Sequence, residues 1–151
     1  MHEWDANFWK SIVDNMLTGV YVTDISEKFL YVNEIFSIAS GYSKEELLGM
    51  SIYDMVHPED LERAKNAGDR VKQGETLIED FRYITKDGKV RHVLGLYRPF
   101  IYKNKGYAVG NYIDITLQKK LERKLKESEE FYRMLVDRSF AGIYIVQNGK
   151  I

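Results

Sequence analysis

Apolar residues in the first part of the chain recur at the three- and four-residue spacing of a helix. The positions are Trp4, Phe8, Trp9, Ile12, Val13, Met16 and Leu17. Because residues three and four apart lie on one face of a helix, this pattern predicts an amphipathic helix over residues 1–17. Gly19 is expected to end it.

Two shorter runs follow with the β-branched and aromatic composition of strands. Residues 20–23 and 29–32 flank a polar turn at residues 24–27, which predicts a hairpin. Residues 77–85, 90–102 and 107–115 predict three further strands, joined at Asp87-Gly88 and at residues 103–106. Pro99 cannot donate a backbone hydrogen bond, so we expect a bulge or a sheet edge there.

Short helical patterns occupy the middle of the chain. One begins at Asn33 and ends at Gly41, and the spacing of Ser43 and Glu46 is typical of a capping box. A longer helix is expected after Pro58, closed by Gly74. Strands are predicted before and after these helices along the chain. This order indicates one α+β domain with an antiparallel sheet over residues 18–116.

A long charged helix is expected next, over residues 117–137. Its apolar positions are Leu117, Leu121, Leu125, Tyr132 and Leu135. With Ser128 counted between Leu125 and Tyr132, their spacing averages about 3.6 residues, whereas a strict heptad repeat requires 3.5. Two interpretations stay open: a solvated connector with ion pairs along its surface, or a coiled coil with a local irregularity that joins two copies of the chain.

The opening of the chain recurs near its end. Residues 8–23 (FWKSIVDNMLTGVYVT) align without a gap with residues 131–146 (FYRMLVDRSFAGIYIV), and the Phe, Val, Asp, Gly and Tyr at five positions are identical. We interpret residues 131–151 as the truncated start of a second repeat of the same domain. On this interpretation, residues 143–146 are expected to form a strand.

Composition and charge exclude several classes of function. Lys and Arg number 22 against 23 Asp and Glu, a formal charge of −1 that favours neither nucleic acid nor a membrane surface. The absence of cysteine excludes disulfides and thiolate chemistry. We find no signal peptide, no apolar run long enough to span a bilayer, no catalytic motif and no metal-ligand spacing. These features predict a cytoplasmic, non-catalytic protein without a metal site.

Several short motifs occur together in a fixed order. They are Tyr31-Val32-Asn33, Gly41-Tyr42-Ser43, Glu45-Glu46-Leu47-Leu48-Gly49, His57-Pro58-Glu59-Asp60, Phe81-Arg82, Lys86-Asp87-Gly88 and Asp114-Ile115-Thr116. With this order and spacing, residues 8–116 resemble a PAS domain. The resemblance implies a five-stranded antiparallel sheet flanked by short helices around a small cavity, with connector helices at both ends. It also implies a sensory module that signals to an output domain, such as a histidine kinase, in the same chain.

Two cofactors of PAS domains, flavin and haem, can be compared with the residues present in this chain. Blue-light PAS domains bind flavin through a reactive cysteine and a set of polar side chains. Those positions are occupied here by Ile52, Tyr53, Val56, Tyr83, Val93 and Tyr112. Haem-binding PAS domains place a ligand on the long helix, where residues 58–73 contain no histidine. We interpret His57 as a helix-capping residue and His92 as facing outward, so neither a cysteine-adduct flavin nor haem is expected and the cofactor stays unknown.

Strand alternation indicates which side chains would face the cavity. The candidates for ligand binding are Tyr21, Phe36, Tyr83, Val93, Gly95, Tyr97, Gly110 and Tyr112. Gly95 and Gly110 are expected to leave space, and the phenols could orient a small polar or aromatic ligand. The alternative is that the tyrosines fill the core and satisfy their hydroxyls internally.

Two functions follow from these features and stay open. In the first, the state of the cavity is relayed through the last strand and the 117–137 helix, with Asp114 anchoring the junction by hydrogen bonding. In the second, a ligand-free PAS module serves as a dimerisation and spacing unit. Both predict a homodimer through the flanking helices and a downstream output domain, and the first adds a small-molecule ligand.

Overall fold

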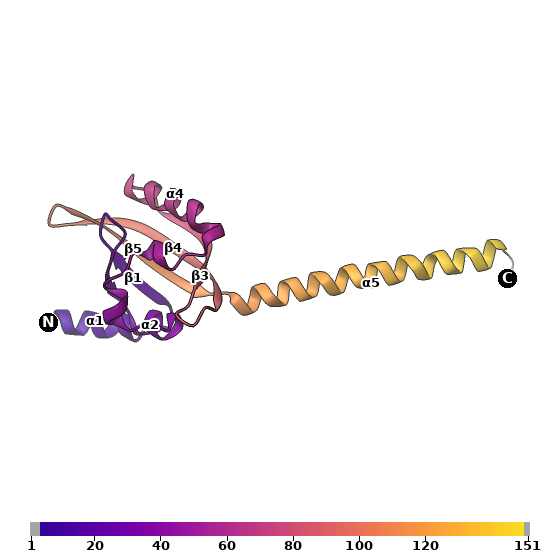
Figure 1. Ribbon diagram of the computed structural model, residues 1–151, viewed down its shortest axis with the longest axis horizontal. Coiled ribbons are helices and arrows are strands. Elements are labelled where there is room, and N and C mark those ends of the chain that lie inside the picture. The colour runs from indigo at the N-terminus through magenta and orange to yellow at the C-terminus, as the bar shows by residue number, and fades with distance from the viewer. Residues whose placement is uncertain (1–3, 150–151) are drawn as a thin grey trace. The chain divides into compact units, whose positions relative to one another are not determined.

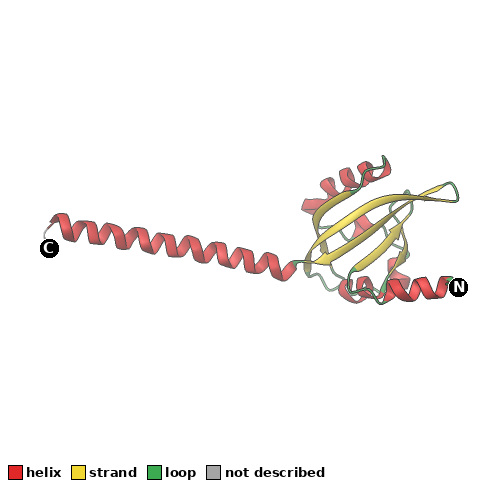
Figure 2. Cartoon of the chain, turned by 180° about the vertical axis from the view of Figure 1, so that it is seen from behind, coloured by secondary structure: helices red, strands yellow, loops and turns green. Residues whose placement is uncertain are grey.

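The computed structural model describes residues 4–149, and the side chains of residues 4–138. Within this part of the chain, one five-stranded antiparallel sheet has the strand order β2-β1-β5-β4-β3 (Figures 1 and 2). The strands are β1 (Gly19–Thr23), β2 (Phe29–Val32), β3 (Leu77–Ile84), β4 (Val90–Tyr102) and β5 (Lys105–Asp114). The predicted α+β class and sheet are confirmed, and the opening and closing strands are neighbours because β1 pairs with β5.

The β4–β5 hairpin differs from the sequence pattern in its turn. β5 begins at Lys105, two residues earlier than expected, because Lys103 and Asn104 alone make the turn with φ values of 49° and 63°. Positive φ at both central residues matches the twist of a two-residue hairpin. Pro99 causes no bulge, since it stays in register with Ala108. Pairing of β4 with β3 ends at Tyr97, so Pro99 lies at the predicted sheet edge.

Helices α1 (Ala6–Asp14) and α2 (Glu34–Ser40) adjoin the β1–β2 hairpin (Figure 1). α1 is shorter than the predicted helix over residues 1–17. It begins after Asp5, whose carboxylate accepts a hydrogen bond from the Phe8 amide, and Asn15 caps its end. α2 ends at Gly41, where a φ of 79° suits glycine.

Asn33 joins these elements through one buried side chain. Its Oδ1 accepts hydrogen bonds from the amides of Val20 (2.9 Å) and Phe36 (3.2 Å). Its Nδ2 donates to the carbonyl oxygens of Val13 (3.0 Å) and Thr18 (2.9 Å). Because Asn33 is completely buried, α1, β1 and α2 are held together by hydrogen bonds that exclude water.

Short helices connect α2 to α4 (Leu61–Lys72), the helix that covers one face of the sheet (Figure 1). They are α3 (Lys44–Leu47) and the 3-10 turns η1 (Ile52–Asp54) and η2 (Pro58–Asp60). The predicted capping box of Ser43 and Glu46 is confirmed, and so is the capping role of His57, whose Nδ1 accepts from the Glu59 amide at 3.1 Å.

Asp60 fastens the start of α4 to β3. Its nearly buried carboxylate accepts hydrogen bonds from the Arg82 amide (2.8 Å), Nε (3.1 Å) and Nη2 (2.8 Å). The guanidinium and amide of Arg82 favour the charged carboxylate, and this lowers the pKa of Asp60 from 3.8 to about 2.

The variant Asp60→Asn is expected to lose about 2 kcal/mol of unfolding free energy at neutral pH. The pKa of Asp60 is lower in the folded chain than in the unfolded chain, so its stabilisation is complete above the unfolded value of 3.8 and disappears as the pH falls toward 2. Urea unfolding of both proteins at neutral pH, near pH 4 and near pH 2.5 should show a steadily shrinking difference.

Glu59→Gln is the matched control for this variant. Glu59 also contacts Arg82, at 3.1 Å, but its side chain is 72% exposed. Its replacement should cost less than about 0.5 kcal/mol at any of these pH values. A difference between wild type and Asp60→Asn that is the same at neutral and acidic pH would contradict the role of the charge.

The helix α5 (Thr116–Gly149) follows the sheet domain and extends beyond the predicted range of 117–137. It includes residues 143–146, so the strand expected there is wrong for this structure. A strand needs a neighbouring strand to satisfy its backbone, whereas a helix bonds within itself. The division into a second repeat from residue 131 stays a prediction, and residues 150–151 lie outside the described part of the chain.

Large apolar side chains are exposed along α5. They are Leu117, Leu121, Leu125, Phe131, Tyr132, Met134 and Leu135. Over the described range 4–149, no helix has the length and apolar character needed to cross a membrane.

Candidate functional site

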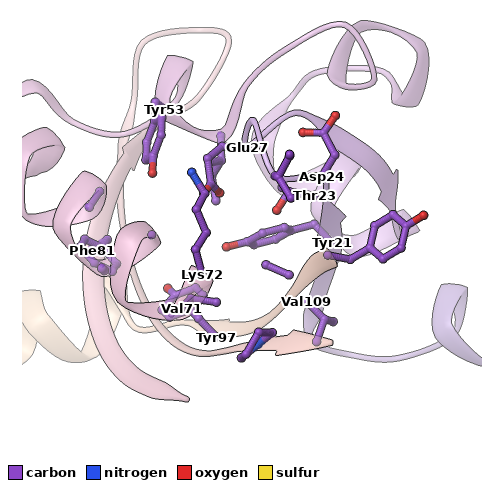
Figure 3. A pocket seen from close by; sticks show the side chains of 18 of the residues that line it. Tyr21, Thr23, Asp24, Glu27, Tyr53, Val71, Lys72, Phe81, Tyr97 and Val109 are labelled. Carbon is purple, nitrogen blue, oxygen red and sulfur yellow. The ribbon is translucent and has the colours of Figure 1, made fainter. Parts of the chain in front are cut away.

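A cavity of about 740 Å³ lies between the sheet and the helices that cover it (Figure 3). Part of its apolar lining comes from two clusters of packed side chains. One contains Tyr21, Phe36 and Tyr112, and the other contains Phe81 with Ala64, Ala67 and Val71 of α4. Tyr97 packs against both clusters. The volume lies in the range of about 300–1,000 Å³ that small-molecule sites occupy.

Most of the candidate residues from strand alternation line this cavity. They are Tyr21, Phe36, Tyr83, Val93, Tyr97 and Tyr112. The other two candidates, Gly95 and Gly110, lie in the same sheet rows but are not part of the cavity wall.

The rings of Tyr97 and Tyr21 occupy the space above Gly95 and Gly110. A Cβ atom at Gly110 would lie 2.3 Å from the Tyr21 ring, and one at Gly95 would lie 2.3 Å from the Tyr97 hydroxyl. The expectation that these glycines enlarge the cavity is therefore wrong. They accommodate aromatic rings that form its floor, which is a structural role.

Tyrosine and glycine therefore alternate across the three central strands, β1, β5 and β4. In one row Tyr21 pairs with Gly110, which pairs with Tyr97. In the next row Gly19 pairs with Tyr112, which pairs with Gly95. We call this arrangement of Tyr21, Tyr97, Tyr112 and their three glycines the tyrosine–glycine floor.

Burial keeps the phenols of Tyr21, Tyr83, Tyr97 and Tyr112 as neutral hydroxyl groups at physiological pH. Burial raises the pKa of Tyr83 to about 12 and raises the pKa of Tyr21 well above its ordinary value. Burial also raises the pKa values of Tyr97 and Tyr112. Neutral phenols can both donate and accept hydrogen bonds, so they suit an uncharged polar group of a ligand.

The wall made by α4 was missed from the sequence. Ala64, Ala67, Gly68 and Val71 line the cavity from this helix. Small side chains at helical spacing were an available signal, because they allow a helix to lie close to another element. The spacing of apolar residues indicated an apolar face on this helix, but it did not indicate that this face lines the cavity.

A polar end of the cavity was also missed. Glu27, in the β1–β2 turn, is only 8% exposed and its carboxylate pairs with Lys72 Nζ at 3.2 Å. Tyr53 and the buried Thr23 line the same region (Figure 3). A turn residue is expected in solvent, so no pattern along the chain distinguishes Glu27.

His92 does not line the cavity, in agreement with the predicted outward direction. Its Nε2 lies 2.6 Å from a carboxylate oxygen of Asp80, a half-exposed residue on the neighbouring strand. The hydrogen bond to His92 lowers the pKa of Asp80. This pair therefore belongs to the outer face of the sheet.

A family model described as the PAS fold matches residues 29–110, more than half of the chain. The chain belongs to the PAS family. This PAS chain is 28% identical to sporulation kinase A of Bacillus subtilis over 144 residues, which are 94% of this chain and 24% of that protein. It is 26% identical to the sensor histidine kinase TmoS of Ectopseudomonas mendocina over 82 residues, which are 53% of this chain and 8% of that protein. It thus spans a quarter or less of each of these relatives.

Solved structures support the same fold. The crystal structure of the PAS domain of a protein from Colwellia psychrerythraea has a TM-score of 0.66 and 24% sequence identity, and the match covers 73% of this chain and 96% of that one. The predicted PAS fold is confirmed by this similarity and by the family match. Sensor histidine kinases are among the relatives.

Proposed function

We propose that this PAS chain is the sensory module of a larger cytoplasmic regulator, a histidine kinase, in which a small molecule in the cavity acts through β5 and α5 on an output domain. The family and the kinase relatives support the signalling context. The cavity supports a ligand, since its volume and its mixture of apolar walls and a few polar groups are those of small-molecule sites.

One observation carries the proposal: β5 both lines the cavity and leads directly into α5. Tyr107, Val109 and Tyr112 of this strand contact the cavity, β5 ends at Asp114, and α5 begins at Thr116. A displacement of β5 by a ligand therefore needs no intermediate element to reach the helix.

The junction is held by contacts to β4. The Ile115 amide donates to the His92 carbonyl oxygen at 2.8 Å, and Asp114 Oδ2 lies 4.0 Å from Arg91 Nε. A hydrogen bond of Asp114 is the anchor expected from the sequence. In the structure an ion pair with Arg91 and the backbone bond of Ile115 lie there, and an anchoring role of Asp114 remains part of the proposal.

The flanking helices support a homodimer as the functional state. Trp4 before α1, Trp9 and Ile12 within it and Met16 after it are exposed, as are the apolar residues of α5. Exposed apolar rows on helices favour association with another chain. This surface also supports the second candidate, a ligand-free module that provides dimerisation and spacing alone.

The test is the behaviour of the chain purified from its own host. The sensor proposal predicts that native mass spectrometry detects a small molecule retained in near-stoichiometric amount. It also predicts that hydrogen exchange in β5 and in the first turns of α5 becomes faster when this molecule is removed. A clean apo mass, with an exchange pattern that extraction leaves unchanged, would favour the dimerisation and spacing function.

A pair of variants tests whether the signal passes through the junction of β5 and α5. Ile115→Pro removes the N–H that donates to His92, whereas Ile115→Ala keeps that N–H and removes a comparable side chain. Both should retain the small molecule. Only Ile115→Pro should abolish the response of α5 to its removal; equal responses in the two variants would contradict transmission through this junction.

A further inference from the structure

One ion pair lies at the polar end of the cavity. Glu27 lies in the β1–β2 turn, and Lys72 reaches it from the last turn of α4 (Figure 3). The carboxylate is nearly buried, whereas the Lys72 side chain is 42% exposed. Both residues line the cavity, so a molecule inside it meets this pair.

Glu27, whose carboxylate lies at the cavity, has an unfavourable backbone conformation. Its φ of 65° lies in the left-handed region, which costs a residue with a side chain about 1 kcal/mol or more. The Glu27 amide donates to the Asp24 carbonyl oxygen (3.0 Å), and the Glu27 carbonyl oxygen accepts from the Ile52 amide (2.9 Å). The turn therefore fixes the direction of the carboxylate instead of leaving it in solvent.

Gly68 of α4 provides the room for this arrangement. A Cβ atom at this position would lie 3.2 Å from Glu27 Oε1 and 2.3 Å from the Tyr53 hydroxyl. Both polar groups thus lie directly against the helix. Burial raises the pKa of Glu27, the charges of Asp24 and Asp69 add to this effect, and the hydrogen bond and charge of Lys72 oppose it.

Stability gives no reason for such a pair. A partly buried ion pair contributes little net free energy, because removing its charges from water costs about as much as their attraction returns. A strained, buried and charged residue at the wall of a cavity is instead typical of a site that selects ligands.

A second polar group faces the same cavity. The hydroxyl of Thr23 is completely buried and, among the residues that the structure describes, it has no hydrogen-bond partner. The other walls supply aromatic rings, including those of Tyr21, Phe81 and Tyr97. An occupant that satisfies both features has an aromatic body and a polar group that can bond to a hydroxyl.

We propose that Glu27 and Lys72 determine the charge of the ligand, and that this PAS cavity selects an uncharged aromatic molecule with a hydroxyl or carbonyl group. This inference rests on the proposed sensory function. The two charges neutralise each other, and Arg82, another cation of the lining, is already paired with Asp60 at 2.8 Å. A ligand carboxylate would therefore face Glu27, and a ligand ammonium would face Lys72, without a free counter-charge. Asp24 lies in the same turn, but its carboxylate accepts hydrogen bonds from the amides of Ser26 and Lys28.

Three indoles with the same ring and different end groups test the proposal. Tryptophol is neutral, indole-3-acetate is an anion and tryptamine is a cation at neutral pH. Isothermal titration calorimetry of the full chain, freed of small molecules, should show tryptophol binding at least about tenfold more tightly than either ion.

Two variants should redirect this preference. Glu27→Gln leaves the charge of Lys72 unopposed, so indole-3-acetate should become the preferred probe. Lys72→Met leaves the charge of Glu27 unopposed, so tryptamine should become the preferred probe. Each reversal should amount to about tenfold or more in relative affinity. Glu62→Gln and Lys65→Met change exposed charges elsewhere on α4 and should keep the wild-type order.

Several outcomes would overturn the specificity proposal. They are equal affinities of the three indoles for the wild type, an unchanged order in both variants, or no binding of any indole up to millimolar concentration. The sensory function is tested separately, by hydrogen exchange of α5 with bound tryptophol. If tryptophol binds with the predicted charge preference but leaves that exchange unchanged, the specificity holds and the sensory function fails.

Discussion

Replacing Asn33 with alanine is expected to lower the free energy of unfolding by about 3–5 kcal/mol. The side chain is completely buried and bonds to the backbone of Val13, Thr18, Val20 and Phe36. Alanine removes all of these hydrogen bonds and leaves buried donors and acceptors unsatisfied, at about 1–3 kcal/mol for each group that water cannot reach. Urea unfolding followed by circular dichroism measures the loss.

Two further variants show whether the hydrogen bonds of Asn33 are the cause. Asn33→Asp keeps an acceptor for Val20 and Phe36 but cannot donate to Val13 or Thr18, and it places a charge beside their carbonyl oxygens. It should be destabilised about as strongly as Asn33→Ala. Asn15→Ala removes an exposed asparagine bond to the Ser11 carbonyl oxygen and should cost less than about 1 kcal/mol. A loss below 1 kcal/mol for Asn33→Ala would contradict this account.

Replacing Gly110 with alanine is the second change with a large expected effect, about 2–4 kcal/mol of destabilisation. The added Cβ would lie 2.3 Å from the ring of Tyr21, closer than any van der Waals contact. That ring cannot move aside freely, because it is buried and packs edge-on against Phe29 and Phe36. Thermal and urea unfolding should both report the strain.

A control in the same strand separates this clash from a general effect of alanine. Gly106 also lies in β5, and a Cβ atom there would be 3.7 Å from Ile25, an ordinary contact. Gly106→Ala should therefore be neutral within about 0.5 kcal/mol. Tyr21→Leu removes the obstructing ring, so Gly110→Ala should cost much less in that background; a fully additive double variant would show that the ring is not the obstacle.

Local patterns in the sequence predicted most of the fold for identifiable reasons. Ser43 and Glu46 formed the expected capping box, since a cap depends on neighbours three residues apart. Alternation along β3, β4 and β5 placed Tyr83, Val93 and Tyr112 on the cavity side, because strand periodicity is a property of the backbone. The motif order indicated the family that the comparisons show.

The remaining features depend on contacts between distant parts of the chain. The role of Gly110 requires the strand register, which pairs it with Tyr21 of β1, and the role of Gly95 depends on the direction in which the Tyr97 ring of the same strand turns. The burial of Glu27 requires α4 to lie beside the β1–β2 turn. The helical state of residues 143–146 depends on which partners a segment finds, and its amino acids suit a strand as well as a helix.

The tyrosine–glycine floor has a consequence for how relatives of this chain can diverge. Each ring fills the volume over one of these glycines, either on the paired strand or, for Tyr97 and Gly95, two residues away in the same strand, so a change at one position alone either opens a void or creates an overlap. Neutral drift is therefore confined to paired exchanges, such as a smaller ring facing a larger neighbour. Covariation at these six positions, more than conservation of any one of them, should record how PAS cavities of this type acquire new shapes.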